Sequence, residues 1–388
     1  MSKLNSLKTC LNSITITNNF SKGFYDDFKR KHDYLRISVI DKCNFKCKYC
    51  YPQTSKFIAT PMSQLLGYQE ILKLIDIFER HGDIKKIRLT GGEPLMRKDT
   101  IRIIDHITKH TGIKIVGLTT NGYYLDQKVG DLKEAGLTNL NISLDTLDPD
   151  KFSYITGQKL KVKTTKTIHT LNSTERFEKV YNTMLSCVQN KDFPVIKINC
   201  VIMKDFNETE IIDFVNLTKY HDISVRFIEY MPFLDNGWDR SVFIPYFQMI
   251  DMIKLSYPSL IKYEGSLAKE TAKSYGFGSK LLCYKYTESE LYKIPGFIGT
   301  IGFITTMSQN FCGDCNRLRL TANGKLKNCI FGDNSLDLKS LLRNDTLKDD
   351  DFELTIVDHI KRFLKTKKEY HTENENRSQS LPMIQLGG

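Results

Sequence analysis

The sequence predicts an α/β protein whose main domain is a partial (β/α)6 barrel, with a C-terminal extension closing its open side. Short β-rich runs alternate with longer segments of helical spacing, which is the pattern of a parallel sheet. The most unusual residues follow these runs directly. In (β/α) barrels the chemistry lies at this end of the strands, so the two observations support one architecture.

Six runs are expected to form the strands of the barrel. They span residues 34–40, 86–90, 114–120, 139–145, 195–203 and 225–231. Segments between them carry helical spacing, as at Leu65, Leu72, Ile75 and Phe78. We expect a leader at 1–33, the barrel at 34–235, the extension at 236–335, and a helical region with a tail at 336–388. The Lys- and Thr-rich segment 157–174 is expected to be a surface insertion.

Composition limits the function classes. The net charge is +11, but most of the excess is lysine spread along the chain, and no aromatic and basic stripe suited to single-stranded nucleic acid is found. The most apolar stretch, 295–307, is shorter than the roughly 20 residues of a membrane helix. We therefore expect neither nucleic acid nor membrane as a partner.

The cysteines favour metal binding over disulfides. Six of the ten cysteines fall into two tight triplets, which is typical of ligands in a reducing compartment. Residues 1–25 contain Lys3, Lys8 and Lys22 and no acid before Asp26, as in a mitochondrial transit peptide. This pattern weakly favours the mitochondrial matrix. The alternative is a disordered tail on a cytoplasmic protein.

The first triplet is the run CNFKCKYC, with Cys43, Cys47 and Cys50 directly after the first predicted strand. A cubane iron–sulfur cluster normally has four cysteine ligands, so three leave one iron open to a small molecule. A zinc loop or a redox loop is the alternative. No histidine lies nearby in the sequence, and the strand-then-loop setting favours the open cluster.

The second triplet is Cys312, Cys315 and Cys329, again three ligands. A structural zinc ion needs a fourth cysteine or histidine. The closest histidines, His359 and His371, lie well beyond the triplet in the sequence. We therefore expect a second open four-iron cluster, whose free iron faces a heteroatom of the substrate.

Basic residues are predicted to line the barrel interior. Arg36, Arg88 and Lys197 alternate with apolar residues on three predicted strands, and Arg317 and Arg319 follow Cys315 closely. Any one of them could be a surface residue. Together they favour a site for an anion, because charged donors stabilise a buried negative charge.

These motifs together resemble a known family. The first triplet resembles that of radical S-adenosylmethionine (SAM) enzymes. The runs LRISVIDKCNFKCKYC, IRLTGGEPLMR, GLTTNG, NISLD, RFIEYM, CGDCNRLRLT and the terminal MIQLGG resemble the GTP 3′,8-cyclases of molybdenum cofactor biosynthesis, over about residues 34–388. The resemblance implies a TIM-like barrel of the radical SAM type, two [4Fe-4S] clusters and SAM. Two departures are Lys29-Arg30, where the family has Gly-Arg, and the long 157–174 insertion.

The resemblance also implies roles for individual residues. The expected SAM contacts are Tyr49, Gly92, Ser143 and Met231. The expected GTP contacts are Arg36, Arg88, Thr119, Lys197, Arg226, Arg317, Leu318 through its backbone, and Arg319. The residues expected to assist catalysis are Arg317, Arg319, Gly387 and Gly388, the last two as a tail that reaches into the site.

The implied reaction is the first step of molybdenum cofactor biosynthesis. A 5′-deoxyadenosyl radical from SAM abstracts the ribose 3′ hydrogen of GTP, and the carbon radical attacks C8 of guanine to give 3′,8-cyclo-7,8-dihydro-GTP. Implied partners are a low-potential electron donor, cyclic pyranopterin monophosphate synthase downstream, and a second copy in a homodimer. Alternatives are a radical SAM enzyme that modifies peptides, and a scaffold that stores or senses clusters, although a scaffold leaves the aligned strand-end residues unexplained.

Overall fold

The computed structural model describes residues 22–157, 162–163, 168–169, 173–262, 290–344, 352–371 and 381–387. Residues 1–21 of the predicted leader lie outside this range, as does most of the predicted insertion apart from the two short strands β5 (Val162–Lys163) and β6 (Ile168–His169). No helix in the described part of the chain is long and apolar enough to cross a bilayer.

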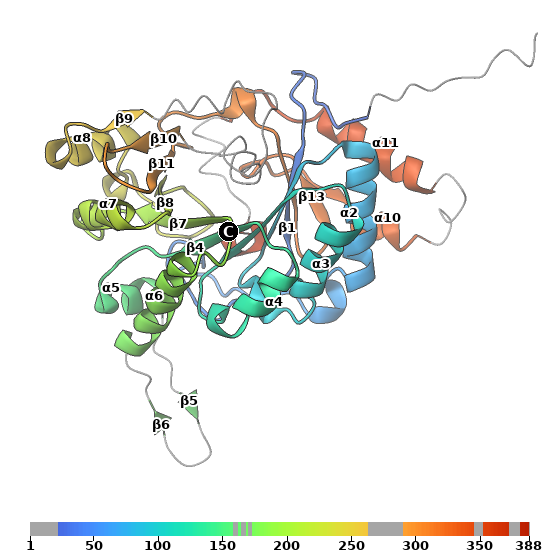
Figure 1. The fold of residues 1–388 in the computed structure, drawn as a ribbon. Coiled ribbons are helices and arrows are strands. Elements are labelled where there is room, and N and C mark those ends of the chain that lie inside the picture. The colour runs from blue at the N-terminus through green and yellow to red at the C-terminus, as the bar shows by residue number, and fades with distance from the viewer. Residues whose placement is uncertain are drawn as a thin grey trace, which may run out of the picture.

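The six predicted strands are all present. Strands and helices alternate in the order β1 (Tyr34–Ser38), α2 (Tyr68–Gly82), β2 (Lys86–Thr90), α3 (Thr100–His110), β3 (Ile115–Thr120), α4 (Val129–Glu134), β4 (Asn139–Ser143), α5 (Pro149–Ile155), α6 (Ser173–Gln189), β7 (Val195–Ile202), α7 (Ile211–Tyr220) and β8 (Ser224–Glu229). The six strands lie side by side and parallel in this order, with the helices on the outer face (Figure 1). The prediction of a partial (β/α)6 barrel is confirmed.

The C-terminal extension adds strands to both edges of this core. Its elements are α8 (Tyr246–Ser256), β9 (Ile261–Lys262), β10 (Glu290–Lys293), β11 (Thr300–Ile304), β12 (Arg317–Leu320), β13 (Lys325–Lys327), β14 (Leu336–Asp337), α10 (Leu338–Leu342), α11 (Phe352–Leu364) and α13 (Met383–Leu386). Strand β11 pairs in parallel with β8, and β12 pairs in parallel with β1. The resulting twelve-stranded sheet runs from β14 to β9, so the extension flanks the opening without joining its edges. The predicted domain boundaries stay a prediction.

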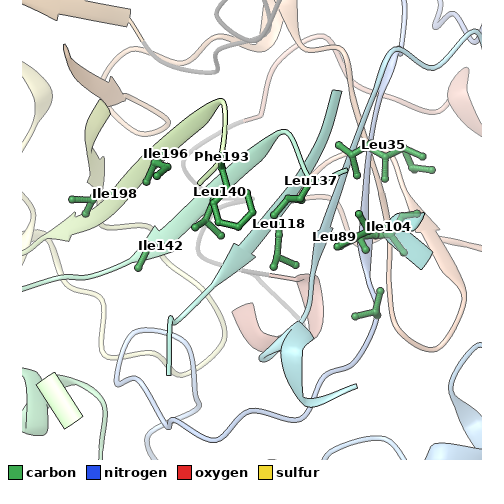
Figure 2. Close-up of a cluster of buried hydrophobic side chains, with 14 of the residues drawn as sticks. Leu35, Leu89, Ile104, Leu118, Leu137, Leu140, Ile142, Phe193, Ile196 and Ile198 are labelled. Atoms are coloured by element: carbon green, nitrogen blue, oxygen red, sulfur yellow. The ribbon is translucent and has the colours of Figure 1, made fainter. Parts of the chain in front are cut away.

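The outer face of the core strands is apolar. Side chains alternate between the faces of a strand, so Leu89, Leu118, Leu140 and Ile196 point outward and pack with helix residues such as Ile104 (Figure 2). Helix α2 contributes Ile71, Leu74, Ile75 and Phe78, the spacing of one helical face. The inner face is left for polar residues, and there the functional site lies.

Candidate active site

The first triplet lies in a loop that the barrel holds firmly. The backbone amides of Lys46 and Lys48 donate to the carbonyls of Thr156 and Ile155 at 2.9 and 3.0 Å. Cys43, Cys47 and Cys50 are partly buried and line one cavity. The loop therefore holds three thiols together at the carboxyl end of β1.

These thiols resist ionisation on their own. Burial, followed by the charge of Glu93, raises the pKa of Cys43 to about 12. Burial and the neighbouring thiols also raise the pKa of Cys47 and Cys50. Metal binding requires deprotonated cysteines. The donor set therefore fits a cationic iron cluster, whose positive charge would offset the burial of three thiolates.

The GGE turn after β2 packs against the backbone that leads into the triplet. The amide of Gly92 donates to the carbonyl of Ile40 at 2.6 Å, and a Cβ at Gly92 would lie 2.4 Å from the Lys42 carbonyl. Only glycine permits this approach. The fully buried Glu93 accepts hydrogen bonds from the hydroxyl of Thr120 and the amide of Asn121, both at 2.8 Å, while burial raises its pKa to about 7.

The four predicted SAM contacts all line the same cavity, namely Tyr49, Gly92, Ser143 and Met231. The side-chain amide of Asn236 donates to the carbonyls of Tyr49 and Met231 at 3.1 and 2.9 Å, which ties the cysteine loop to the end of β8. The Tyr49 hydroxyl donates to Asp145. Burial raises the pKa of Asp145 to about 6.

The second triplet lines the opposite part of this cavity. The amide of Cys315 donates to the Cys312 carbonyl at 3.1 Å, and Arg317 lies over the Phe311 ring, 4.3 Å from its centre. Burial alone would raise the pKa of Cys315. The positive charges of Arg317 and Lys367 outweigh burial and lower this pKa to about 6. The surroundings thus favour a thiolate at this cysteine.

His371 lies well beyond the second triplet in the sequence but next to it in space. Its Nδ1 lies 3.0 Å from the Cys312 sulfur, because the chain after α11 folds back onto the cysteine loop. Three cysteines and a histidine are also a common zinc set. Among the described residues, no three His, Cys, Asp or Glu side chains form a group that could hold a metal ion. The described side chains thus do not form a site for a single zinc ion, and measuring the bound metal distinguishes zinc from an iron cluster at this triplet.

A row of arginines crosses the inner face between the two triplets. Arg36 on β1 is in register with Arg88 on β2 and with Arg319 on β12. Like charges at adjacent positions of a sheet destabilise it. The row therefore favours binding of an anion that neutralises it. Gly117 on β3 makes room, because a Cβ there would lie 2.7 Å from the Arg88 guanidinium carbon.

Polar groups without partners lie beside the arginine row. Thr119 and Asn141 are register neighbours on β3 and β4, and both line the cavity. Their buried Oγ1 and Oδ1 atoms have no hydrogen-bond partner among the residues that the structure describes. Buried polar atoms in proteins are nearly always paired. These two atoms are consequently candidates for ligand contacts.

The remaining predicted GTP contacts differ in position. Arg226 lines the cavity, and its Nε donates to Asn199 at 2.9 Å. Lys197 is in register with Asn141, but its fully buried side chain is not among those lining the cavity. The Leu318 side chain is buried, and its residue pairs with Leu35 in the sheet.

The tail reaches the interior of the barrel, where Figure 1 shows the C-terminal end near the centre of the molecule. Gly387 has a φ of 81°, and a Cβ there would lie 2.5 Å from the Thr90 hydroxyl and 3.1 Å from Cβ of Ser38. Ile384 and Leu386 are buried. Gly387 is thus wedged against the ends of β1 and β2. Gly388 lies outside the described residues.

Both triplets share one cavity, whose empty space, including the part open to solvent, measures about 1580 Å³. Five arginines line it, namely Arg36, Arg88, Arg226, Arg317 and Arg319. The sequence did not identify Asn141, Asn199 or Asp145 as parts of this site. Their inward positions on predicted strands could have indicated the two asparagines. For His371 no feature of the sequence indicated a place in the site.

Comparison with known proteins agrees with this architecture. Residues 37–218 match the Radical SAM superfamily, and residues 223–373 match the family described as Molybdenum Cofactor Synthesis C. The crystal structure of Streptococcus suis SuiB superposes with a TM-score of 0.52 at 14% identity, covering 88% of this chain and 70% of that one. This likeness concerns the fold alone. The fold and the first match define a radical SAM protein.

Sequence relatives narrow the class. The GTP 3′,8-cyclase of Thermodesulfovibrio yellowstonii is 36% identical, covering 82% of this chain and 88% of the relative. The mitochondrial GTP 3′,8-cyclase of Arabidopsis thaliana is 38% identical, with coverage of 96% and 85%. Human molybdenum cofactor biosynthesis protein 1 is 41% identical over 84% of this chain, which spans only 45% of that relative's length. The chain belongs to the GTP 3′,8-cyclase family of molybdenum cofactor biosynthesis.

Proposed function

We propose that this chain is a GTP 3′,8-cyclase that catalyses the first step of molybdenum cofactor biosynthesis. The observation that carries the proposal is the single cavity lined by both cysteine triplets and five arginines. The names of the bacterial and plant relatives support the same reaction. Neither a storage scaffold nor a sensor requires a basic wall between two metal sites.

In this proposal Cys43, Cys47 and Cys50 hold one [4Fe-4S] cluster that binds SAM. Cys312, Cys315 and Cys329 hold the second. When bound, the first cluster and SAM supply the 5′-deoxyadenosyl radical. Tyr49, Gly92, Ser143 and Met231 hold SAM, and the close contact of Gly92 with the Lys42 carbonyl keeps that wall free of side chains.

The arginines would bind the triphosphate. GTP carries close to four negative charges, and each charge-assisted hydrogen bond contributes about 1.5–3 kcal/mol. Arg36, Arg88 and Arg319 offer three neighbouring guanidinium groups, and Arg317 on β12 and Arg226 on β8 line the same cavity. Lys197 adds positive charge behind this wall. Thr119 and Asn141 would satisfy their buried oxygens on the nucleotide.

The wall also determines which hydrogen reacts. With the triphosphate fixed and guanine at the second cluster, ribose lies toward the SAM site. Its 3′ hydrogen moves to the deoxyadenosyl carbon, and the C3′ radical forms a bond to C8. One electron from a low-potential donor and one proton from solvent then complete the dihydro ring, so the product is an isomer of GTP. Gly387, wedged against Ser38 and Thr90, would close this end of the cavity around the substrate.

The decisive experiment incubates the anaerobically reconstituted protein with SAM, a strong reductant and GTP deuterated at the ribose 3′ position. We expect 5′-deoxyadenosine that contains deuterium and a cyclised GTP isomer. ATP should give neither in quantity. Deoxyadenosine without deuterium would mean that SAM cleavage is uncoupled from GTP, and would favour a peptide-modifying radical SAM enzyme instead.

We further propose the cellular setting. The Arabidopsis relative is named as mitochondrial, and the acid-free leader is consistent with import into the mitochondrial matrix. A cytoplasmic location is the alternative. The protein would receive electrons from a low-potential donor, act as a homodimer, and pass its product to cyclic pyranopterin monophosphate synthase.

A further inference from the structure

A short segment after α11 brings two donors to the second triplet. Lys367 is only 5% exposed, and its Nζ donates to the Asn328 carbonyl at 2.6 Å and to the Cys315 sulfur at 3.3 Å. A buried ammonium group needs such partners, because removing a charge from water is costly. Its position at this sulfur therefore indicates a specific role.

His371 approaches a second sulfur of the same triplet. Its Nδ1 lies 3.0 Å from the Cys312 sulfur, and its ring packs on Phe331 with 4.7 Å between ring centres. With the proton on Nδ1, the ring donates a hydrogen bond to that sulfur. Lys367 and His371 thus contact different cysteines of the triplet, although both belong to one short segment.

Arg30 fixes this segment to the cysteine loop. Its NH1 donates to the carbonyls of Cys312 and Glu369 at 2.7 and 2.8 Å, and its NH2 donates to Lys368 at 2.8 Å. A 2.6 Å ion pair with the buried Asp26 holds the guanidinium in place. The distances between the two donors and the two sulfurs are consequently set by a buried clamp.

We propose that Lys367 and His371 are positioning residues that raise the reduction potential of the second cluster by hydrogen bonding to its cysteine sulfurs. The inference rests on the proposed function, which assigns a cluster to this triplet. Reduction adds negative charge to the cluster and its sulfurs, so donors stabilise the reduced form more than the oxidised form. At the first triplet, the Cys43 sulfur accepts instead from neutral groups, the backbone amide of Phe45 at 3.3 Å and the side-chain amide of Asn121 at 3.6 Å.

The test is an EPR-monitored redox titration of the reconstituted full-length chain. Lys367→Met and His371→Ala are each made in the wild type and in a Cys43→Ala/Cys47→Ala background, where the second cluster is observed alone. Each change should raise the ratio of oxidised to reduced second cluster about tenfold at a fixed potential, which is ~59 mV for one electron. The first cluster should not shift.

Matched controls are Lys365→Met, an exposed lysine two residues from Lys367, and His359→Ala on α11. His371→Asn, whose amide can replace the Nδ1 donor, should recover most of the potential. Unchanged potentials in both main variants, with full iron, would overturn this inference alone. So would strong nitrogen hyperfine coupling from His371, which would make it a ligand. Zinc instead of iron at this triplet would refute the second cluster of the proposed function itself.

Discussion

The two cysteine triplets line one cavity but lie in opposite electrostatic surroundings. Carboxylates flank the first, where Glu93 and Asp145 add to burial in raising thiol pKa values. Cations flank the second, where Arg317 and Lys367 lower the pKa of Cys315. Negative surroundings disfavour an added electron, and positive surroundings favour one. The difference teaches that the first site is suited to give electrons away and the second to bind an electron-rich ligand.

The largest expected effect separates the two triplets by mutation. Cys43→Ala should halve the iron content, roughly from eight to four atoms, and abolish 5′-deoxyadenosine formation while GTP still binds. Cys312→Ala should instead weaken GTP binding. Iron analysis, product chromatography and calorimetry check both outcomes. Cys187→Ala, at a buried cysteine outside both triplets, is the control. Full iron in the Cys43 variant would contradict the two-site comparison.

Variants of the C-terminal tail test whether the cavity shared by both triplets must be closed by Gly387. Gly387→Ala should abolish most cyclisation, because its Cβ would collide with the Thr90 hydroxyl. Gly296→Ala is a matched control, since Gly296 also has a positive φ, 86°, but nothing lies within 4 Å of its Cβ position. Both variants pay about 1 kcal/mol of backbone strain. Equal activity in the two would show that the wedge at Gly387 is not required. Deleting Gly387 and Gly388 should have the same effect as Gly387→Ala.

The next prediction distinguishes the two sites by their ligands, because the arginines should affect GTP binding and not SAM binding. Arg317→Ala or Arg319→Ala should weaken GTP binding by about 1.5 kcal/mol, roughly tenfold, through loss of a charge-assisted contact. SAM affinity and iron content should stay unchanged. Isothermal titration measures both ligands, with the exposed Arg102→Ala on α3 as the control. Unaltered GTP affinity in both arginine variants would show that the arginines do not bind the triphosphate.

The smallest expected effect concerns acid stability beneath the second triplet. Burial, with Lys367 nearby, lowers the pKa of His32 to about 3. Between this value and the unfolded pKa of about 6.5 the unfolded chain binds one more proton, so stability falls as the pH falls. The contribution of His32 to this slope should reach ~1.4 kcal/mol per pH unit, whereas the buried Glu93 and Asp145, whose pKa values are raised to about 7 and about 6, contribute in the opposite sense. Urea unfolding at pH 7 and pH 5 measures it.

His32→Gln should remove the His32 contribution and leave that of Glu93 and Asp145, whereas the exposed His110→Gln should change neither. Asp26, which hydrogen-bonds His32 at 3.1 Å, stays ionised in this window because its own pKa is lowered, so it does not contribute. A variant as acid-sensitive as the wild type would show that His32 is not the group responsible.

The sequence predicted the elements that depend on local patterns. All six core strands are confirmed, because alternation of apolar and polar residues is a property of each strand alone. The convergence of Arg36 and Arg88 also followed, since adjacent parallel strands bring equivalent positions into register. Strands β11 and β12 were not foreseen within the irregular extension. Their parallel pairing depends on edges formed far earlier in the chain.

The missed site residues have the same cause. His371 is separated from Cys312 by 59 positions, and its contact depends on the path of α11 and on the Arg30 clamp. No spacing rule connects such residues. Lys367 looked like one more lysine in a Lys-rich chain until its burial was known. The departure at Lys29-Arg30 lies directly before the clamp, because Lys29 replaces the family's glycine while Arg30, which holds the second triplet, matches the family.

The pairing of β12 with β1 affects how the nascent chain folds during synthesis. Arg36 and Arg319 are neighbours in space, so synthesis must reach β12 before the arginine row is complete. Until then β1 presents an unpaired edge, and open edges recruit strands from other molecules. Expression that pauses between these segments should therefore favour aggregates over soluble protein. The same dependence means that a ribosome-bound barrel contains Arg36, Arg88 and Arg226 but lacks Arg317 and Arg319, two of the five arginines that line the cavity.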